Sequence, residues 1–463
     1  MVRVGYSLQF TNWILDKSSN SSGSKRLNHL SVSSPDMGPR GDEVEARAAK
    51  VRVIRDPLHG DIRIPDEVKA LIDTATFQRL HRVKQLSTCD LVFPGATHSR
   101  FAHSLGAYHL STQLLDRLRD LHPGVISDED AELVGYAVLL HDIGHPPFSH
   151  MLEDREIFRT FRGHEEWGRL ILEDSENDLR QALVGLVGER GISRLMDIYA
   201  GRVHPIALHE IVSSQLDVDR MDYLLRDQHH SGADVGTFDV QRIFRALRIA
   251  DDGSLRLRPE GVPAVESYLL TRLHMYDLVY FHKMNILTSE YHKLLLRRAR
   301  ELASKGELSL ERTMESMLLD GNLSTEDYLR LDDGVVSSAV GSWHSHTDPV
   351  LSHWVDRLLS RDSFHKRLRI PGITPVILQR CMIPLSAEIT AAGHDPMRDL
   401  LLARVDNTGY RPYMGGIRLT DGRDIADVSA VAAAISKTVH DTMVFVPVNV
   451  REACEEIVRN TLS

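Results

Sequence analysis

Four short stretches of the chain concentrate side chains that can bind a metal ion. They contain His98 and His103; His141, Asp142, His145 and His150; His164; and Asp217, Asp219 and Asp222. Imidazole and carboxylate ligands together suit a divalent ion that keeps coordination positions open for water. Such an ion lowers the pKa of bound water, so that hydroxide becomes available as a nucleophile near neutral pH. These stretches therefore predict a metal-dependent hydrolytic centre.

The His141–Asp142 pair follows a segment that we expect to form a buried helix. Ser127 and the three acidic residues after it resemble a capping box, and the run Leu133–Leu140 is apolar on every side. A buried carboxylate without a partner is strongly destabilising, and a bound cation would relieve that cost. An isolated His-Asp pair is more often an ordinary polar helix end bonded to the backbone. The metal interpretation therefore depends on the ordered set of stretches around it.

The order of these motifs resembles that of the HD-domain triphosphohydrolases. The motifs are HSRFAHS (98–104), HDIGHPPFSH (141–150), the His-Glu at 164–165 and DVDRMDYLLRD (217–227). The similarity extends from about Asp56 to Lys283, roughly half of the chain. Within that family it is nearest to the SAM-and-HD-domain-containing deoxynucleoside triphosphohydrolases and their bacterial homologues that lack the SAM domain. Because the first 50 residues show no SAM-like helical bundle, we expect that module to be absent.

The resemblance implies a set of metal ligands and a set of catalytic residues. The implied metal ligands are His103, His141, Asp142 and Asp219. The residues implied to surround the α-phosphate and the attacking or leaving group are His145, His150 and His164. Glu153 stands where the family has an acidic residue three positions after His150, but it is longer by one methylene, which could alter proton transfer. The implied reaction is attack of metal-activated water on the α-phosphorus of a deoxynucleoside triphosphate, releasing deoxynucleoside and triphosphate. His150, or His145 through a water, would protonate the leaving 5′-oxygen.

A second group of residues is expected to bind the substrate. Arg100 lies three residues before His103 and would share its helix face, while Arg220 and Tyr223 accompany Asp219 in the last motif. Arg272, Tyr276, Tyr280 and Lys283 step by four, four and three residues, which places them on one face of a predicted helix. The resemblance assigns Arg272 and Lys283 to phosphates, Tyr280 to the sugar ring, and Gln85 and Asp227 to the 3′-hydroxyl. The alternative is a solvated helix face with pairs of neighbouring charges.

Nucleotide regulation is a further implication of the resemblance. Relatives are often tetramers activated by nucleotides, so we expect a homo-tetramer or another homo-oligomer, with GTP or a dNTP as activator. Asp73 and Gln78 match positions that read an activating guanine, and Arg52 stands where a lysine is usual. His81 replaces an arginine expected three residues after Gln78. The alternative is that Asp73 and Gln78 only cap and decorate a helix.

The pattern of apolar residues predicts a mostly α fold in three parts. Residues 1–50 are rich in Ser, Asn, Gly and charge, as is typical of a flexible arm. Residues 51–305 form the predicted HD core, including one long helix from Pro263 to about Lys305. Residues 306–463 form a helical extension and a small α+β lobe, with short β-like runs at 416–422 and 443–448 around a helix near 428–436.

Composition restricts the class of protein. The chain has 463 residues, of which 42% are hydrophobic and 26% charged, and a net charge of −10, which argues against nucleic acid as its main partner. No run approaches the roughly 20 apolar residues of a membrane span. Cys89, Cys381 and Cys454 form no metal or disulfide motif, which favours a reducing compartment and a cytoplasmic protein. Fe, Mn, Mg and Zn all tolerate the predicted ligands, so the metal stays open.

Two other functions remain consistent with these motifs. Another HD phosphohydrolase, acting on mono-, cyclic or modified nucleotides, would share the metal set but would not need a face for a long phosphate tail. A nucleotide-sensing scaffold with little turnover would be favoured by the loss of a metal ligand, and each predicted ligand is present in this chain.

Overall fold

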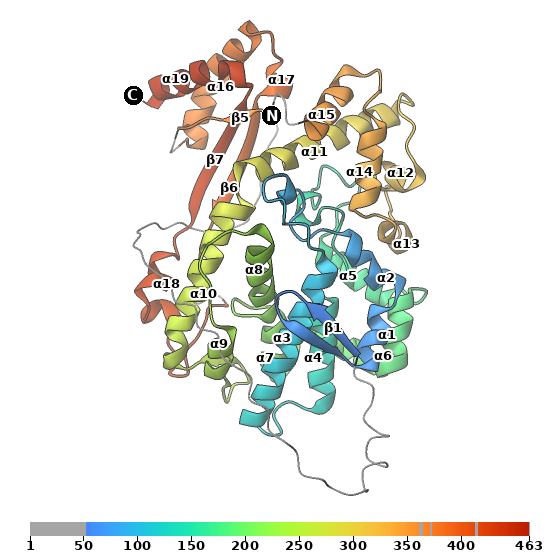
Figure 1. Ribbon diagram of the computed structural model, residues 1–463, viewed down its shortest axis with the longest axis vertical. Coiled ribbons are helices and arrows are strands. Elements are labelled where there is room, and N and C mark those ends of the chain that lie inside the picture. Colours follow the sequence, from blue (N-terminus) through green and yellow to red (C-terminus); the bar gives the residue numbers. More distant parts are fainter. Residues whose placement is uncertain (1–51, 361–363, 371–372, 413–414, 463) are drawn as a thin grey trace, which may run out of the picture.

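The computed structural model describes residues 52–360, 364–370, 373–412 and 415–462, and helices dominate it (Figure 1). The predicted mostly α fold is confirmed. The arm predicted at residues 1–50 lies outside the described residues. Before residue 262 the described chain forms the helices α1 (Asp66–Ile72), α2 (Ala75–Gln78), α3 (Arg100–Leu121), α4 (Asp128–Leu140), α5 (His164–Glu173), α6 (Asp178–Tyr199), α7 (Ala207–Val212), α8 (Val218–Ser231) and α9 (Val240–Ala246).

Helices α3, α4 and α8 form the centre of the first part. Helix α3 packs against both α4 and α8, and α4 is buried along its length from Leu133 to Leu140. Ser127 is the N-cap of α4, because its side chain accepts a hydrogen bond from the amide of Asp130. The predicted helix start is therefore confirmed. A hairpin of β1 (Arg52–Asp56) and β2 (Gly60–Ile64) packs against α3 (Figure 1).

The long helix predicted from Pro263 to Lys305 is interrupted, so that prediction was wrong. It is divided into α10 (Val262–Met275), a π-helical turn (Tyr276–Tyr280) and α11 (Lys283–Ser304). The π turn adds a residue to the helical repeat. His282 then has an extended backbone and starts α11, because its side chain accepts from the amide of Met284. Side chains before and after this break therefore no longer share one face.

Helices after α11 form the extension and the C-terminal lobe. They are α12 (Arg312–Leu319), α13 (Thr325–Leu329), α14 (Asp333–Ser342), α15 (Pro349–Leu359), α16 (Pro375–Ala391), α17 (Pro396–Asp399), α18 (Ala430–Ala434) and α19 (Arg451–Leu462). Short 3₁₀ turns lie at Arg79–Arg82, Cys89–Leu91, Ser149–Met151, Pro259–Gly261, Ile425–Asp427 and Val448–Val450. Helix α18 lies within the stretch 428–436 where a helix was predicted.

The lobe contains a three-stranded antiparallel sheet in the order β5-β7-β6. Its strands are β5 (Lys366–Arg367), β6 (Leu401–Asn407) and β7 (Val439–Val446), and a separate hairpin pairs β3 (Leu247–Ile249) with β4 (Leu255–Leu257). The predicted run at 443–448 falls largely in β7. The run at 416–422 forms only isolated bridges, one of them between Leu419 and Leu257. Strand β6 was missed by the sequence reading.

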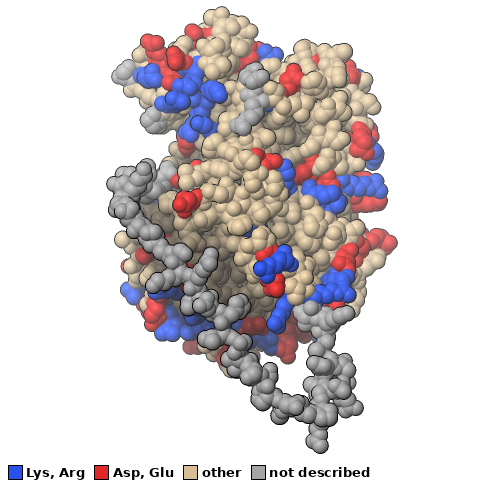
Figure 2. Space-filling model, in the orientation of Figure 1, with Lys and Arg blue, Asp and Glu red and all other residues tan. Residues whose placement is uncertain are grey.

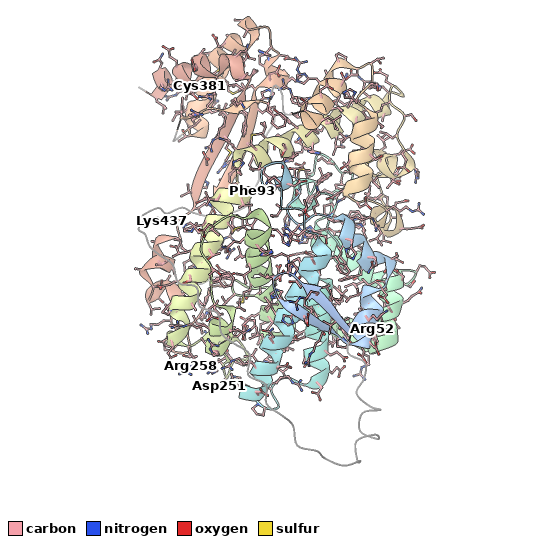
Figure 3. The ribbon with its side chains drawn as sticks, in the orientation of Figure 1. Arg52, Phe93, Asp251, Arg258, Cys381 and Lys437 are labelled. Carbon is pink, nitrogen blue, oxygen red and sulfur yellow. The ribbon has the colours of Figure 1, made fainter. Side chains whose placement is uncertain are left out.

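Two apolar clusters stabilise the chain. The larger runs through the HD core and the helical extension, and the smaller joins α16, α19 and the sheet of the lobe. Cys381 on α16 belongs to this smaller cluster (Figure 3). All three cysteines are buried as free thiols. Among the described residues, no helix is both long and apolar enough to cross a membrane.

Candidate active site

Four predicted metal ligands from three helices converge at the centre of the HD core. His103 lies on α3, His141 and Asp142 follow the last turn of α4, and Asp219 lies in the first turn of α8. The Nε2 atom of His103 is 3.3 Å from Nε2 of His141 and 3.0 Å from Oδ1 of Asp219. The Nε2 atom of His141 is 3.3 Å from Oδ1 of Asp219 and 3.3 Å from Oδ1 of Asp142. The predicted set is therefore brought together.

The distances between these donor atoms fit a single divalent ion bound by all of them. With ligand bonds of about 2.0–2.2 Å, adjacent donors on one ion lie about 3.0–3.6 Å apart. The measured distances between donor atoms of His103, His141 and Asp219 fall in that range. Two imidazoles and two carboxylates also give the mixed donor set that suits a divalent ion with open positions. The residues present can therefore hold the metal.

Charge at the centre is balanced by a small number of buried groups. Burial opposes ionisation of Asp142. Arg100 and the adjacent imidazoles nevertheless hold the pKa of Asp142 well below its usual range. The guanidinium of Arg100 donates to Oδ2 of Asp142 at 2.5 Å. Burial disfavours the charged form of His103, but hydrogen bonds to Asp219 and Asp222 prevail and raise its pKa to about 10. In the protonated form, His103 carries a positive charge beside these carboxylates. A bound metal ion would supply that positive charge in its place.

A second cluster, formed by His145, His150, Glu153 and His164, lies next to the metal ligands. The rings of His145 and His164 stack with centroids 4.0 Å apart. One carboxylate oxygen of Glu153 is 2.8 Å from Nδ1 of His150, and the other is 2.9 Å from Nδ1 of His164. Burial opposes ionisation of Glu153, but these two imidazoles hold its pKa well below its usual range. Despite its extra methylene, Glu153 thus contacts both histidines.

Glycine at position 144 permits this approach of α5 to the end of α4. A Cβ atom at Gly144 would lie 2.1 Å from the carbonyl oxygen of His164 and 2.3 Å from the amide nitrogen of Gly168. Both are backbone atoms that cannot move independently of α5. The glycine in the HDIGH motif is therefore required by the close packing that places His164 over His145.

The loop after His145 has a strained backbone. Phe148 and Ser149 both have positive φ angles, 53° and 54°, which side chains with a Cβ rarely adopt. The amide of Phe148 donates to the buried carboxylate of Asp333 at 2.6 Å. The hydroxyl of Ser149 accepts from Arg100 and donates to the carbonyl of Lys84, at 2.7 Å each. Contacts from other segments therefore hold the loop that presents His145 and His150.

A cavity of about 730 Å³ opens over the metal ligands. The predicted site residues that line it are Gln85, Arg100, His141, Asp142, His145, His150, His164, Asp219, Arg220, Tyr223, Asp227, Tyr276 and Tyr280. His103 and Glu153 lie behind this wall and contact residues that form it. Arg272 and Lys283 do not line it: Arg272 is buried, and Lys283 is exposed beyond the helix break.

One end of the cavity is suited to a hydroxylated ring. The hydroxyl of Tyr280 donates to Asp227 at 2.6 Å, and the other oxygen of Asp227 is 2.8 Å from Nε2 of His98. The side-chain oxygen of Gln85 is buried and has no hydrogen-bond partner among the described residues. Because a buried acceptor without a partner is costly, this oxygen is available for a ligand hydroxyl.

Several residues that line the cavity were not predicted from the sequence. Arg169 and Arg202 line it from α5 and the segment after α6, and Arg404 and Asp406 line it from β6. Each of these arginines also pairs with a nearby carboxylate. No motif in the sequence identifies these residues as part of the site. The two on β6 also follow the metal motifs by more than 170 residues.

The residues predicted to bind an activator lie away from the cavity wall. Arg52 is exposed at the start of β1 (Figure 3). Asp73 is the C-cap of α1 and pairs with Lys69, and the side-chain amide of Gln78 donates to the carbonyl of Ile72 at 2.9 Å. On the face shown in Figure 2, basic and acidic side chains are interspersed and form no broad basic surface.

Two family models match this chain. The HD domain matches residues 100–227 and the HD associated region matches residues 238–376. All four metal-ligand candidates fall within the first match. Helices α10 to α15 fall within the second match, together with the loop up to the start of α16.

Known proteins are similar over much of the chain. It is 33% identical over 372 residues to the uncharacterized protein YwfO of Bacillus subtilis, covering 79% of this chain and 82% of that protein. It is 33% identical over 275 residues to the deoxynucleoside triphosphate triphosphohydrolase SAMHD1 of Homo sapiens, covering 52% of this chain but only 43% of that protein. A phosphohydrolase structure from Bacteroides thetaiotaomicron superposes with a TM-score of 0.73 at 30% identity, covering 86% of this chain and all of that one.

Proposed function

Because this chain belongs to the HD-domain family of phosphohydrolases, we propose that it hydrolyses deoxynucleoside triphosphates to deoxynucleoside and inorganic triphosphate. One observation carries the proposal. One cavity is lined by three members of the metal-ligand set, by the three imidazoles of the second cluster and by the residues of the ring-binding end: His141, Asp142, Asp219, His145, His150, His164, Gln85, Asp227 and Tyr280. The similarity to SAMHD1, which is named for this reaction, supports the choice of substrate.

Four residues of the chain would hold the cofactor, a divalent ion such as Fe, Mn, Mg or Zn: His103, His141, Asp142 and Asp219. When bound, this ion supplies a water of lowered pKa and neutralises charge on the α-phosphate. Arg100 keeps Asp142 ionised as a ligand. Its guanidinium also lines the cavity, where it adds positive charge beside the reacting phosphate.

His150 is placed to act as the general acid. Its Nδ1 atom is held by Glu153, which leaves Nε2 to face the cavity that His150 lines. In the reaction the oxygen of a hydroxide ion bonds to the α-phosphorus, and the bond from phosphorus to the 5′-oxygen breaks. The 5′-oxygen takes its proton from His150, so that hydroxide and proton together make up the one water consumed. Burial lowers the pKa of His150, and the hydrogen bond to the ionised Glu153 opposes that shift. Glu153 thus favours the imidazolium form that a general acid needs. The rings of His145 and His164 pack beside it, with centroids 4.8 and 5.3 Å from that of His150.

The sugar would lie between Gln85, Asp227 and Tyr280. The unpartnered oxygen of Gln85 accepts the 3′-hydroxyl, and Asp227 has lone pairs left after its bonds to His98 and Tyr280. The ring of Tyr280 packs against the sugar at C2′, where a 2′-hydroxyl would meet an aromatic face. Arg220, Tyr223 and Tyr276 line the adjacent wall toward the remaining phosphates and the base.

We further infer that the enzyme works as a homo-oligomer and responds to an activating nucleotide, GTP or a dNTP. Relatives described as SAMHD1 homologues motivate this expectation, and Asp73 and Gln78 are the residues expected to contact the activator. In the isolated chain both residues have partners within the chain. An activator would therefore compete with Lys69 and with the carbonyl of Ile72.

A second candidate is another phosphohydrolase activity of the same site, on mono-, cyclic or modified nucleotides. One observation favours it. Arg272 and Lys283, which were expected to bind a long phosphate tail, do not line the cavity. Arg169 and Arg202 line the cavity and offer cations instead, so the tail of a triphosphate retains basic partners in the first candidate as well.

The deciding experiment is product analysis. Purified metal-loaded protein is incubated with each dNTP and NTP, singly and in mixtures, and products are resolved by ion-exchange chromatography with phosphate speciation. Deoxynucleoside and intact triphosphate are the expected products. If an activating nucleotide is required, they will form in mixtures but not with a single dNTP. Absence of dNTP loss with every metal and mixture, together with turnover of a monophosphate or cyclic nucleotide, would support the second candidate.

A further inference from the structure

His103 has a buried carboxylate behind it, on the side of the ring away from the other metal ligands. Its Nδ1 atom donates to Oδ2 of Asp222 at 2.8 Å, and both side chains are fully buried. Its Nε2 atom points the other way, toward Asp219 and His141. One imidazole therefore connects the ligand cluster to a second, separate group of charges.

Asp222 is itself held rigidly. Arg226, one turn later on α8, donates to both of its oxygens at 2.9 and 3.0 Å. The same guanidinium donates to Asp56 at the end of β1, at 2.8 Å. The Nε2 atom of His59 lies 2.6 Å from Oδ1 of Asp222. Three elements, α3, α8 and the β1–β2 hairpin, thus meet at a fully buried carboxylate.

A glycine on α3 makes room for this arrangement. Gly106 lies three residues after His103, on the same face of the helix. A Cβ atom there would be 2.0 Å from Oδ1 of Asp222 and 2.2 Å from Nη2 of Arg226. The carboxylate and guanidinium therefore occupy space that any other residue at position 106 would fill.

The chemistry of this contact determines which ring nitrogen of His103 can bind a cation. A carboxylate that accepts from Nδ1 keeps the proton there, leaves the Nε2 lone pair free for a metal, and increases its basicity. His141 has a comparable bond from Nδ1, but to the backbone carbonyl of Val138 at 2.6 Å. Only the contact behind His103 depends on a side chain that can be exchanged.

We propose that Asp222, fixed by Arg226 and His59, is a positioning residue that sets His103 as an Nε2 donor and thereby sets the affinity of the site for a divalent ion. The inference rests on the metal dependence of the proposed function, but not on the identity of the substrate. The competing explanation is a buried ion network that only joins the β1–β2 hairpin to α8. That network would affect folding stability without affecting the metal.

The test measures binding of Co²⁺ to metal-free full-length protein without nucleotide, together with the visible absorption spectrum of the bound ion. Asp222→Asn is compared with Asp399→Asn, which removes another fully buried, arginine-paired carboxylate in the C-terminal lobe. Asp222→Asn is expected to weaken Co²⁺ binding about 10- to 100-fold and to change its spectrum. Asp399→Asn should stay within about twofold of the wild type in affinity, the scatter expected for a distant site. An unchanged affinity and spectrum in Asp222→Asn would overturn the proposal, even with a lowered melting temperature.

A second pair of variants covers the case in which Asp222→Asn does not fold. Gly106→Ala displaces the carboxylate through its Cβ atom, and Gly185→Ala on α6 is the matched control with open space around it. Weaker Co²⁺ binding in Gly106→Ala alone supports the positioning role, and equal binding in both variants contradicts it. A wild-type protein that binds no divalent ion would overturn the proposed function along with this inference. A wild type that binds Co²⁺ but cleaves no dNTP would leave the positioning role intact.

Discussion

Three of the four candidate metal ligands have a neighbour outside the set that contacts them or balances their charge. Arg100 pairs with Asp142, the carbonyl of Val138 orients His141, and Asp222 lies behind His103. Isolated buried charges of this kind would destabilise the fold, whereas paired ones are tolerated. The ligand set is consequently preformed, and removal of one ligand should act on the metal more than on the helices.

We expect His103→Ala to abolish binding of the metal and turnover together, while most of the helix content is retained. The reason is that His103 contacts two of the other ligand side chains directly. Elemental analysis of the purified variant, enzyme assay and far-ultraviolet circular dichroism make the comparison. His344→Ala, at an exposed histidine outside the cavity, is the control. Stoichiometric metal in His103→Ala would show that His103 is not a ligand.

His292 provides a prediction about pH. Burial lowers its pKa from 6.5 to about 4, so the folded chain keeps it neutral while the unfolded chain protonates it below about 6.5. Its contribution to stability is therefore present above pH 6.5 and is lost as pH falls toward 4. Between pH 7 and pH 5, the free energy of unfolding should fall by about 2 kcal/mol more in the wild type than in His292→Gln. The measurement is urea denaturation of both proteins at pH 7 and pH 5. An equal fall in the free energy of unfolding in the wild type and in His292→Gln would contradict this prediction.

The loop between α4 and the turn at Ser149–Met151 is held by elements from distant parts of the sequence. The hydroxyl of Tyr328 on α13 donates to the carbonyl of Gly144 at 2.6 Å. Arg79 donates to the carbonyls of His145 and Leu331, at 2.9 and 2.7 Å. The helices of the extension thus fix a backbone whose positive φ angles would otherwise relax.

Asp333 at the start of α14 tests this role. Its carboxylate accepts from the amides of Phe148 and Lys84, at 2.6 and 2.9 Å. Asp333→Asn should reduce turnover about 10- to 100-fold through misplacement of His150, while bound metal stays stoichiometric. Asp356→Asn, an exposed carboxylate on α15, serves as the control. Loss of metal in parallel with activity would instead indicate that α14 supports the ligand set.

The cavity is completed only by the C-terminal lobe. Strand β6 contributes Arg404 and Asp406 to its wall, and Asn407 donates to Asp277 of the π turn at 3.0 Å. Burial raises the pKa of the half-buried Asp277 to about 6. The HD core and the lobe therefore both line this cavity.

Arg404→Ala should raise the KM for a nucleotide about three- to tenfold and leave kcat within about twofold, because a cation at the rim contributes to binding and not to the reacting phosphate. Steady-state kinetics at low ionic strength would show the effect most clearly. Arg423→Ala is a matched control, since Arg423 is exposed in the same lobe and pairs with Asp421 outside the cavity. Identical KM values for the two variants would remove β6 from the substrate site.

Local patterns in the sequence were enough to predict the mostly α fold and the N-terminus of α4. The set His103, His141, Asp142 and Asp219 was instead implied by the resemblance of the motifs to the HD-domain triphosphohydrolases, and the structure brings these four side chains together. Spacing of three or four residues places side chains on one helix face, and the HD motif puts its ligands where a buried helix ends. The catalytic and substrate roles of the residues around them stay predictions that the experiments above address.

Packing between distant segments could not be predicted from those patterns. The π turn that separates Lys283 from Tyr280 results from a local rearrangement of helix hydrogen bonds that apolar periodicity does not encode. Asp222 meets Asp56 through Arg226, although the two carboxylates are more than 160 residues apart. Periodicity specifies which side chains share a face, but which faces meet depends on long-range packing of the chain. For that reason motifs in the sequence were enough to name the candidate metal ligands, whereas the side chains that contact them from behind, and the strand β6 that lines the cavity, required the folded structure.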